Sequence, residues 1–222
     1  MNILLVGSNG RMGKCVKKVG SNLGYNFTDF DIESSFKNLK KSEIKKIDVV
    51  LDFASPNVLN DELEFCLKNN KPLVICSTGH TNDQLKTIED FSKKTTIFKT
   101  ENTSLGVAFI ERILKDYGKF LKNYDIKIFE KHHKNKKDSP SGTAKKFLKA
   151  LSLNGVNAEC LSLRSGTCAG EHQILLFGEN EQLQFIHIAE NREIFANYAL
   201  KICEFIKDKK ANKLYEMDDL FC

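Results

Sequence analysis

The sequence predicts an α/β protein in two parts: a doubly wound parallel sheet, and a second α+β domain with an open mixed sheet. Over residues 1–100, short apolar runs alternate with helical patterns, which is typical of a parallel sheet covered by helices. After about Asn102, strand patterns follow one another through short turns, with helices that cover them. We therefore expect one domain at residues 1–103, completed by 193–222, and a second domain at 104–192.

In the first domain, strands are expected where apolar residues run without alternation, and helices where they recur at every third or fourth position. Residues 2–6 form such an apolar run, and Met12, Val16 and Val19 then recur at helical spacing. Pro56, and Thr81 or Asn82, suit the beginnings of two further helices. The expected strands are residues 2–6, 25–31, 47–53, 73–76 and 96–98.

The second domain is expected to begin with a long helix at residues 105–121. Another helix is expected at 140–153, and an amphipathic helix at 195–206 belongs to the segment that completes the first domain. The expected strands are residues 125–131, 159–163, 171–177 and 182–188, with a hairpin at 178–180 between the last two.

The composition is that of an ordinary globular chain of 222 residues, with 41% apolar and 28% charged residues. Its longest apolar runs are far too short to cross a bilayer, and no signal-peptide pattern surrounds residues 2–6. We therefore expect a cytoplasmic protein with no membrane partner. The net charge of +5 comes from lysines that are spread along the chain among acids, which favours a solvated surface over a nucleic-acid site.

The cysteines are scattered and never show CxxC spacing, so neither a zinc site nor a disulfide framework is indicated. Free thiols in a reducing compartment are expected, and Cys222 is expected to be exposed. The seven cysteines are Cys15, Cys66, Cys76, Cys160, Cys168, Cys203 and Cys222.

A glycine-rich loop at residues 7–13 follows the first expected strand and opens the first expected helix. In this context glycines let the backbone approach a pyrophosphate, whose charge is received by amides at the helix start. The spacing is GxxGxxG, so the strict GxGxxG pattern is met only in part, and the loop alone is also compatible with a simple tight turn. Arg11 offers a guanidinium to phosphate, and Asp31 offers a carboxylate to ribose hydroxyls. Together they predict a Rossmann-like dinucleotide site.

The residues after Asp31 bear on the choice of cofactor. Asp31 is followed by Ile32 and Glu33, and the two acids would repel an additional 2′-phosphate. NADH is therefore the expected cofactor, while NADPH stays possible because lysines begin again at Lys37.

Residues 130–144, with the sequence EKHHKNKKDSPSGTA, carry the most reactive side chains of the chain. Adjacent strand residues point to opposite faces, so His132 and His133 serve different surroundings. A histidine beside Lys136 suits proton delivery, and a helix that opens with Ser-Gly-Thr suits a carboxylate. The alternative is a solvated basic loop before a capped helix. A metal site is the weaker functional alternative, because no carboxylate or cysteine stands at ligand spacing.

Taken together, these motifs resemble the dihydrodipicolinate reductase family, also called 4-hydroxy-tetrahydrodipicolinate reductase. The family's signature E-x-H-H-x-x-K-x-D-x-P-S-G-T-A is matched at every fixed position by residues 130–144, and its GxxGRMG loop by residues 7–13. The resemblance spans nearly the whole chain in the right order. Its other elements are DFASP at 52–56 against DF[TS]xP, CSTG at 76–79 against GTTG, NTSLGV at 102–107 against N-[FM]-S-x-G-V, GEH at 170–172, and residues 192–198 against R-x-x-[FY]-A-x-G.

This resemblance implies a two-domain enzyme in which NAD(P)H passes hydride to a cyclic, unsaturated dicarboxylate, giving tetrahydrodipicolinate for diaminopimelate and lysine synthesis. It also implies a homotetramer assembled through the second domain, which would bind the substrate. By position, His132 is expected to be the general acid or base and Lys136 the proton donor, with no metal. The expected substrate-binding residues are His133, Ser141, Gly142 and Thr143. The expected cofactor-binding residues are Gly7, Ser8, Asn9, Gly10, Arg11, Met12, Asp31, Cys76, Ser77, Thr78, Thr100, Glu101, Asn102 and Thr103.

Three residues depart from the family pattern. Cys76 replaces the first glycine of GTTG and adds bulk beside the expected nicotinamide, Thr103 replaces a large apolar residue, and Tyr198 stands in place of a glycine. None of them removes a proposed catalytic group. The alternatives are an oxidoreductase for another aspartate-derived or sugar substrate, a non-enzymatic NADH sensor, and a nucleic-acid module. A sensor has no need of a proton donor, so His132 with Lys136 favours an enzyme.

Overall fold

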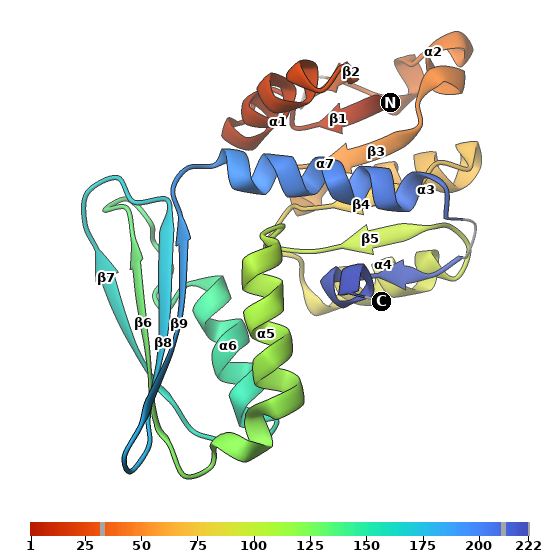
Figure 1. The fold of residues 1–222 in the computed structure, drawn as a ribbon. Helices are drawn as coiled ribbons and strands as arrows, with labels where there is room; N and C mark the ends of the chain where they lie inside the picture. Colours follow the sequence, from red (N-terminus) through yellow and green to blue (C-terminus); the bar gives the residue numbers. More distant parts are fainter. Residues whose placement is uncertain (32–33, 210–211, 222) are drawn as a thin grey trace. The chain divides into compact units, whose positions relative to one another are not determined.

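The computed structural model describes residues 1–31, 34–209 and 212–221, and the chain divides into two compact units (Figure 1). Unit 1 comprises Met1–Thr103 and Phe195–Cys222, and unit 2 comprises Ser104–Ile194. The chain thus leaves unit 1 after its fifth strand, forms unit 2 and then returns. From the sequence we expect this return at residue 193, whereas the compact unit resumes at Phe195.

Unit 1 is built on a parallel sheet whose order among the described strands is β10-β5-β4-β3-β1-β2. The order reverses at β1, because the chain passes from β1 to β2 on one side and then to β3 on the other. Ligands of such sheets bind outside the carboxyl ends of the strands at this switch point. The strands are β1 (Asn2–Val6), β2 (Asn26–Phe30), β3 (Val49–Asp52), β4 (Leu73–Ile75), β5 (Ile97–Lys99) and β10 (Leu214–Tyr215).

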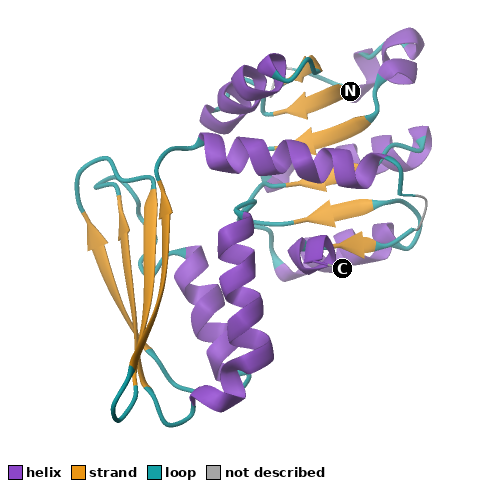
Figure 2. Ribbon diagram, viewed as in Figure 1, coloured by secondary structure: helices purple, strands orange, loops and turns teal. Residues whose placement is uncertain are grey.

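Helices cover both faces of this sheet, as shown in purple in Figure 2. One apolar core joins residues such as Ile3 and Leu51 to Val16 of α1 and Ile202 of α7, and the other joins Leu4 and Val50 to α3 and α4. Burial on both faces explains why the central strands are uniformly apolar. The helices are α1 (Arg11–Asn22), α2 (Lys41–Lys46), α3 (Leu59–Asn69), α4 (Asn82–Ser92) and α7 (Glu193–Lys207), with 3₁₀ turns at Phe36–Asn38, Pro56–Val58 and Met217–Phe221.

Unit 2 is a mixed sheet of order β7-β6-β8-β9, in which β7 runs parallel to β6 and the other neighbours are antiparallel. Burial alternates along β6, which is typical of a sheet covered on one face only. Its core is formed with two helices. The elements are α5 (Leu105–Tyr117), a 3₁₀ turn (Gly118–Leu121), β6 (Asp125–His132), α6 (Gly142–Ser152), β7 (Glu159–Arg164), β8 (Gly170–Phe177) and β9 (Gln182–Ala189).

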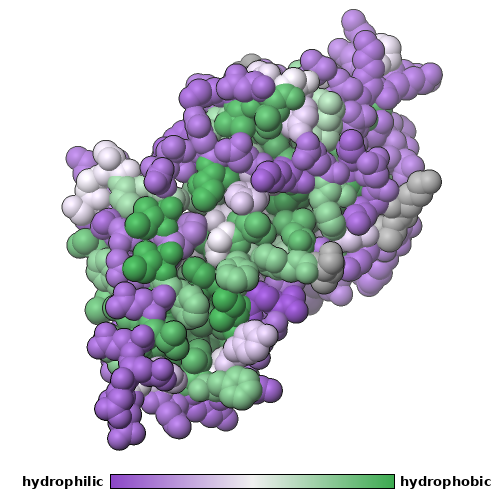
Figure 3. Space-filling view, viewed as in Figure 1, coloured by the Kyte–Doolittle hydropathy of each residue, from purple (hydrophilic) through white to green (hydrophobic). Residues whose placement is uncertain are grey.

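The other face of this sheet carries exposed apolar side chains, among them Leu161 and Leu163 on β7 and Ile186 and Ile188 on β9. We call these four residues the outer face. Green, apolar atoms gather over the unit 2 strands on the side seen in Figure 3.

The predicted fold class is confirmed, and the differences lie in short or polar elements. Two elements are not predicted from the sequence: α2, in which Ile44 is the only apolar residue, and β10, which has two residues. The long helix expected at 105–121 ends at Tyr117 and continues as a 3₁₀ turn. The expected hairpin is present, closed by the Gly178 amide donating to Glu181 O at 2.9 Å.

Among the described residues, no helix is both long and apolar enough to cross a membrane, and no group of His, Cys, Asp or Glu side chains is arranged to hold a metal ion. The six described cysteines are free thiols. Cys222, expected to be exposed, and Ile32 and Glu33, which follow Asp31, lie outside the described residues.

Candidate active site

The loop between β1 and α1 is packed so closely that two of its glycines have no room for a side chain. Gly7 has φ +83°, and a Cβ there would lie 2.9 Å from the backbone of Ala54. A Cβ at Gly13 would lie 2.2 Å from the carbonyl oxygen of Gly7. Helix α1 begins at Arg11, so the amides of its first turn have no acceptor within the helix. The loop therefore offers amides, with close backbone approach, to an anion.

Asp31, at the end of β2, is already bonded to this loop. Its carboxylate accepts Ser8 Oγ at 2.5 Å and the Asn9 amide at 3.1 Å. These hydrogen bonds connect the loops after β1 and β2. A ribose that binds Asp31 would therefore bond to a carboxylate that also accepts hydrogen bonds from Ser8 and Asn9.

A second set of contacts ties together the turns after β3, β4 and β5. Asp52, which ends β3, accepts Ser77 Oγ and the Ala54 amide, the latter at 2.7 Å. Lys99, which ends β5, donates to Ser77 O at 3.1 Å. Burial raises the pKa of Asp52 to about 6, although its hydrogen bonds from Ser77 and Ala54 oppose the rise. Ser77 is thus anchored from both neighbouring strands.

The remaining predicted cofactor residues follow the same strand ends. Cys76 is buried, and burial raises the pKa of its thiol, so this cysteine is a neutral apolar residue rather than a reactive thiolate. Thr100 Oγ1 donates to Asn102 O at 2.8 Å, and Thr103 Oγ1 donates to Phe195 O at 2.8 Å. The residues predicted to hold the dinucleotide therefore gather at the carboxyl edge of the unit 1 sheet.

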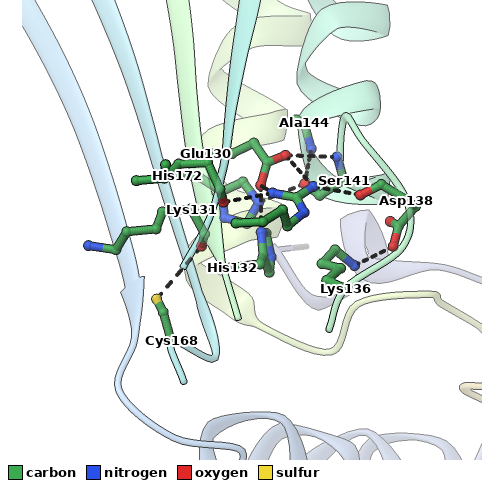
Figure 4. A network of polar contacts seen from close by, with 11 residues as sticks. Glu130, Lys131, His132, Lys136, Asp138, Ser141, Ala144, Cys168 and His172 are labelled. Atoms are coloured by element: carbon green, nitrogen blue, oxygen red, sulfur yellow. Dashed lines mark hydrogen bonds and ion pairs between the residues drawn. The ribbon is translucent and has the colours of Figure 1, made fainter. Parts of the chain in front are cut away.

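In unit 2 a buried carboxylate, Glu130, forms the centre of a polar network (Figure 4). It accepts His132 Nδ1 at 2.5 Å, the Ser141 amide at 3.2 Å, and both terminal nitrogens of Arg164 at 2.7 and 2.9 Å. Burial alone would raise the pKa of Glu130, but the hydrogen bonds from Arg164, Ser162 and His132 outweigh it and lower the pKa to about 2. Glu130 is therefore an anion at neutral pH.

An ionised carboxylate only accepts hydrogen bonds, so the His132 proton is on Nδ1 and its Nε2 carries the lone pair. A Cβ at Gly170 would lie 3.0 Å from this Nε2, so the glycine leaves room for the imidazole ring. Burial lowers the pKa of His132, Glu130 raises it, and Lys136 and Arg164 lower it further. His132 is thus a neutral imidazole with a defined tautomer at neutral pH.

Two more histidines follow Glu130 in a row across the sheet, because the register pairs Glu130 with His172 and His172 with His187. His172 Nε2 lies 3.1 Å from the Oγ of Ser141, and His187 Nε2 lies 2.9 Å from the Oγ of Ser104. These serines cap the N-termini of α6 and α5. The histidines therefore connect the inner face of the sheet to the starts of both helices.

The loop after β6 brings a cation and a helix start together. Lys136 Nζ lies 2.9 Å from Asp138 Oδ1, and the carboxylate of Asp138 also accepts the Gly142 amide. Gly142 is exposed at the first position of α6, next to half-buried Thr143. The His133 amide donates to Cys168 O at 2.9 Å, which fixes the start of the loop. Ser141 uses both its amide and its hydroxyl inside the protein.

The predicted catalytic and substrate-binding residues therefore gather in unit 2, and the predicted cofactor-binding residues gather in unit 1.

The residues that hold these side chains in place are not predicted from the sequence. Glu130 precedes His132 by two residues and so shares its strand face, a signal that was available. Arg164 had no local signal, because it meets His132 only through the parallel register of β6 and β7. Asp52, Lys99, His172 and His187 were also left out of the predicted site.

Comparison with known proteins covers both units. The family description "Dihydrodipicolinate reductase, N-terminus" matches residues 1–103, and "Dihydrodipicolinate reductase, C-terminus" matches residues 106–221. The 4-hydroxy-tetrahydrodipicolinate reductase of Clostridium novyi is 36% identical over 98% of this chain and 97% of its own length. That of an Exiguobacterium species is 35% identical, over 100% and 96%.

Among solved structures, the dipicolinate-bound dihydrodipicolinate reductase of Paenisporosarcina sp. TG-14 superposes with a TM-score of 0.78 over 97% of each chain, at 21% identity. A probable dehydrogenase from Thermotoga maritima gives a TM-score of 0.59 at 12% identity. At these identities the superpositions support the fold, whereas the sequence matches extend over both units. The chain belongs to the dihydrodipicolinate reductase family, whose members are NAD(P)H-dependent oxidoreductases.

Proposed function

We propose that the protein is a 4-hydroxy-tetrahydrodipicolinate reductase, which uses NAD(P)H to reduce a small cyclic dicarboxylate to tetrahydrodipicolinate in diaminopimelate and lysine synthesis. One observation carries the proposal: a carboxylate, that of Asp138, already lies between the Lys136 ammonium and the Gly142 amide. A cation and a helix-start amide are the donors that a dianionic ring requires. A substrate carboxylate would take the place of Asp138 at these donors.

Each side chain in unit 2 then has a defined task. Gly142 and Thr143, with His133, bind a carboxylate of the ring, and Ser141 holds the helix start in place through its own internal bonds. His132 acts as acid or base through Nε2, since its Nδ1 proton is donated to Glu130. Lys136 Nζ supplies the proton to the ring atom next to the carbon that is reduced. General acid catalysis of this kind contributes about 10²–10⁴ in rate.

The residues of unit 1 suit a dinucleotide because the close approach at Gly7 and Gly13 leaves backbone amides for a pyrophosphate. The loop residues 7–12, Asp31, the turn at 76–78 and residues 100–103 would hold the cofactor, which supplies a hydride when bound. NADH is the proposed cofactor, because the Asp31 carboxylate stands where a 2′-phosphate would need a cation. We also propose that the enzyme works in the cytoplasm, where reduced nicotinamide cofactors are available.

The catalytic assignment is tested with His132→Ala and Lys136→Ala. Each is expected to lower kcat by about 10²-fold or more, because each removes a proton-transfer group. The dissociation constant for NADH, measured by fluorescence titration, is expected to stay near that of the wild type. The assay follows NADH oxidation with the product of dihydrodipicolinate synthase made in situ.

Lys137→Ala is the matched control, because Lys137 is an exposed neighbour in the same loop. It is expected to keep wild-type turnover. Normal kcat in both the His132 and the Lys136 variants would remove the assigned roles.

Cofactor choice is tested by comparing KM for NADH with KM for NADPH. A lower KM is expected for NADH, and Asp31→Ser is expected to narrow the difference because it removes the repelling charge. A lower KM for NADPH in the wild type would overturn the argument from Asp31.

A tetramer is also proposed, assembled through the outer face of the unit 2 sheet. Leu161, Ile186 and Ile188 are each more than half exposed on this face, and exposed apolar side chains that share one face are a feature of protein–protein interfaces. Covering it with the same face of another protomer would bury these side chains without any change in the fold.

A further inference from the structure

We propose that Glu130 and Arg164 form a positioning pair that fixes the orientation and tautomer of His132, and that through Asp138 the same pair holds the loop carrying Lys136. This inference rests on the proposed function, in which His132 and Lys136 handle the protons. Glu130 and Arg164 lie outside the predicted site, and their proposed role is to hold His132 and Lys136 in the positions that proton transfer requires.

The Glu130 carboxylate is surrounded by hydrogen-bond donors. A carboxylate has about four lone-pair sites, and four donors lie within hydrogen-bonding distance of its two oxygens, in addition to the Ser162 side chain. Oε1 accepts Arg164 Nη2 at 2.7 Å and the Ser141 amide at 3.2 Å, and Oε2 accepts His132 Nδ1 at 2.5 Å and Arg164 Nη1 at 2.9 Å. The side chain of Glu130 is fully buried. One carboxylate therefore fixes a strand end, a helix cap and an arginine on the neighbouring strand at once.

Arg164 is needed for this arrangement because an isolated buried carboxylate would take up a proton. A protonated Glu130 could donate to His132 Nδ1 and so reverse the imidazole tautomer, moving the lone pair away from Nε2. The parallel register places Arg164 opposite His132, and its guanidinium binds both oxygens of Glu130. Arg164 Nη2 also donates to Asp138 O at 2.5 Å. The arginine thus links the carboxylate to the loop in which Asp138 pairs with Lys136.

The charged and titratable groups that face His132 come from four elements. Glu130 lies on its own strand, Lys136 in the following loop, Arg164 on β7, and His172 on β8 at 5.1 Å between ring centroids. Glu130 is the only anion among these four. Removing the Glu130 charge should therefore lower the pKa of the Glu130–His132 pair. Removing the Arg164 charge should raise the pKa of this pair.

The test uses Glu130→Gln, which keeps the size of the side chain, and Arg164→Gln, which keeps a polar but shorter side chain; each removes one charge. The readout is the pH profile of kcat/KM, which reports ionisations of the free enzyme. The limb that belongs to the coupled Glu130–His132 pair is expected to move by about one pH unit, to lower pH in Glu130→Gln and to higher pH in Arg164→Gln. These opposite directions hold whichever protonation state of His132 is active, and kcat falls in both variants.

A loss of structure alone would not move the limb in opposite directions. Arg164→Lys, which restores the cation without the paired contacts, is expected to return the limb towards wild type while kcat stays low. The matched controls are Asp116→Asn and Arg112→Gln, which remove the same two charges from an exposed ion pair on α5. Both controls are expected to keep the wild-type profile.

A second readout needs no substrate. The five histidines are followed by NMR titration of the enzyme without ligands, and the ring nitrogen shifts of His132 give its tautomer. The Nδ1–H form is expected in the wild type, with the midpoint displaced in opposite directions in the two variants. Displacements in the same direction, or none, would overturn the positioning role. A wild-type enzyme without reductase activity would overturn the proposed function instead, and the titration would still decide the role of the pair.

Discussion

At the scale of single residues, His172 is held neutral by its surroundings. Burial, with smaller contributions from His132 and His187, lowers its pKa to about 3. In the unfolded chain a histidine titrates near 6.5. Between these two values the unfolded state binds more protons than the folded state, so stability falls as the pH drops through this window.

We therefore predict that His172→Gln flattens the acid side of the stability curve. At pH 7 the variant is expected to be less stable than the wild type, because the contact with Ser141 is altered. Below pH 6.5 the difference is expected to narrow by up to about 1.4 kcal/mol per pH unit, since the variant no longer resists protonation at this position. Urea denaturation at pH 7, 6 and 5 measures it. Parallel curves for the two proteins would contradict the prediction.

The site residues show which parts of a site a sequence reveals. His132, His133 and Lys136 stand in one short segment whose side chains suggest proton transfer by themselves. Arg164 stands 32 residues further along than His132, and only strand register brings it to Glu130. Such partners depend on pairing between distant segments, which no local pattern encodes.

At the scale of elements, the uniformly apolar strands could be predicted because burial on both faces leaves a clear signal. Helix α2 could not, since five of its six residues are polar and it has no apolar stripe. Strand β10 is too short for a pattern, and it forms because β5 offers it a parallel edge. In both cases the surrounding structure, rather than local preference, determines the element.

The start of α6 supports a prediction that separates binding from stability. Apart from its chain neighbours and the backbone of its own helix, no atom lies within 4 Å of a Cβ built at Gly142, so Gly142→Ala fits the fold and should stabilise the protein by about 0.4–1 kcal/mol. The added methyl group would crowd a carboxylate at the helix start, so KM for the dicarboxylate is expected to rise about tenfold, or about 1.4 kcal/mol. Steady-state kinetics and thermal unfolding measure the two effects.

Ser152→Ala, at the other end of the same helix, is the control. It should leave KM unchanged. If Gly142→Ala also left KM unchanged, the substrate carboxylate would bind elsewhere.

At the scale of the whole molecule, the outer face of unit 2 predicts assembly. Ile188→Lys places a charge among the exposed apolar side chains of the outer face, so it is expected to break the proposed tetramer into smaller species, as measured by light scattering after gel filtration. Leu153→Lys is the matched control, because Leu153 is 71% exposed but lies beyond the end of α6. A wild-type protein that elutes as a monomer would refute the proposed interface.

The path of the chain also has a consequence for biosynthesis. Unit 2 interrupts unit 1, and the returning helix α7 supplies Ala196, Leu200 and Ile202 to the core around Ile3. During translation, the part of this sheet face that α7 covers must therefore stay exposed until residues 193–207 have left the ribosome. A premature stop anywhere in unit 2 would release a nascent product with that part of the apolar face open, a form that chaperones and proteases recognise.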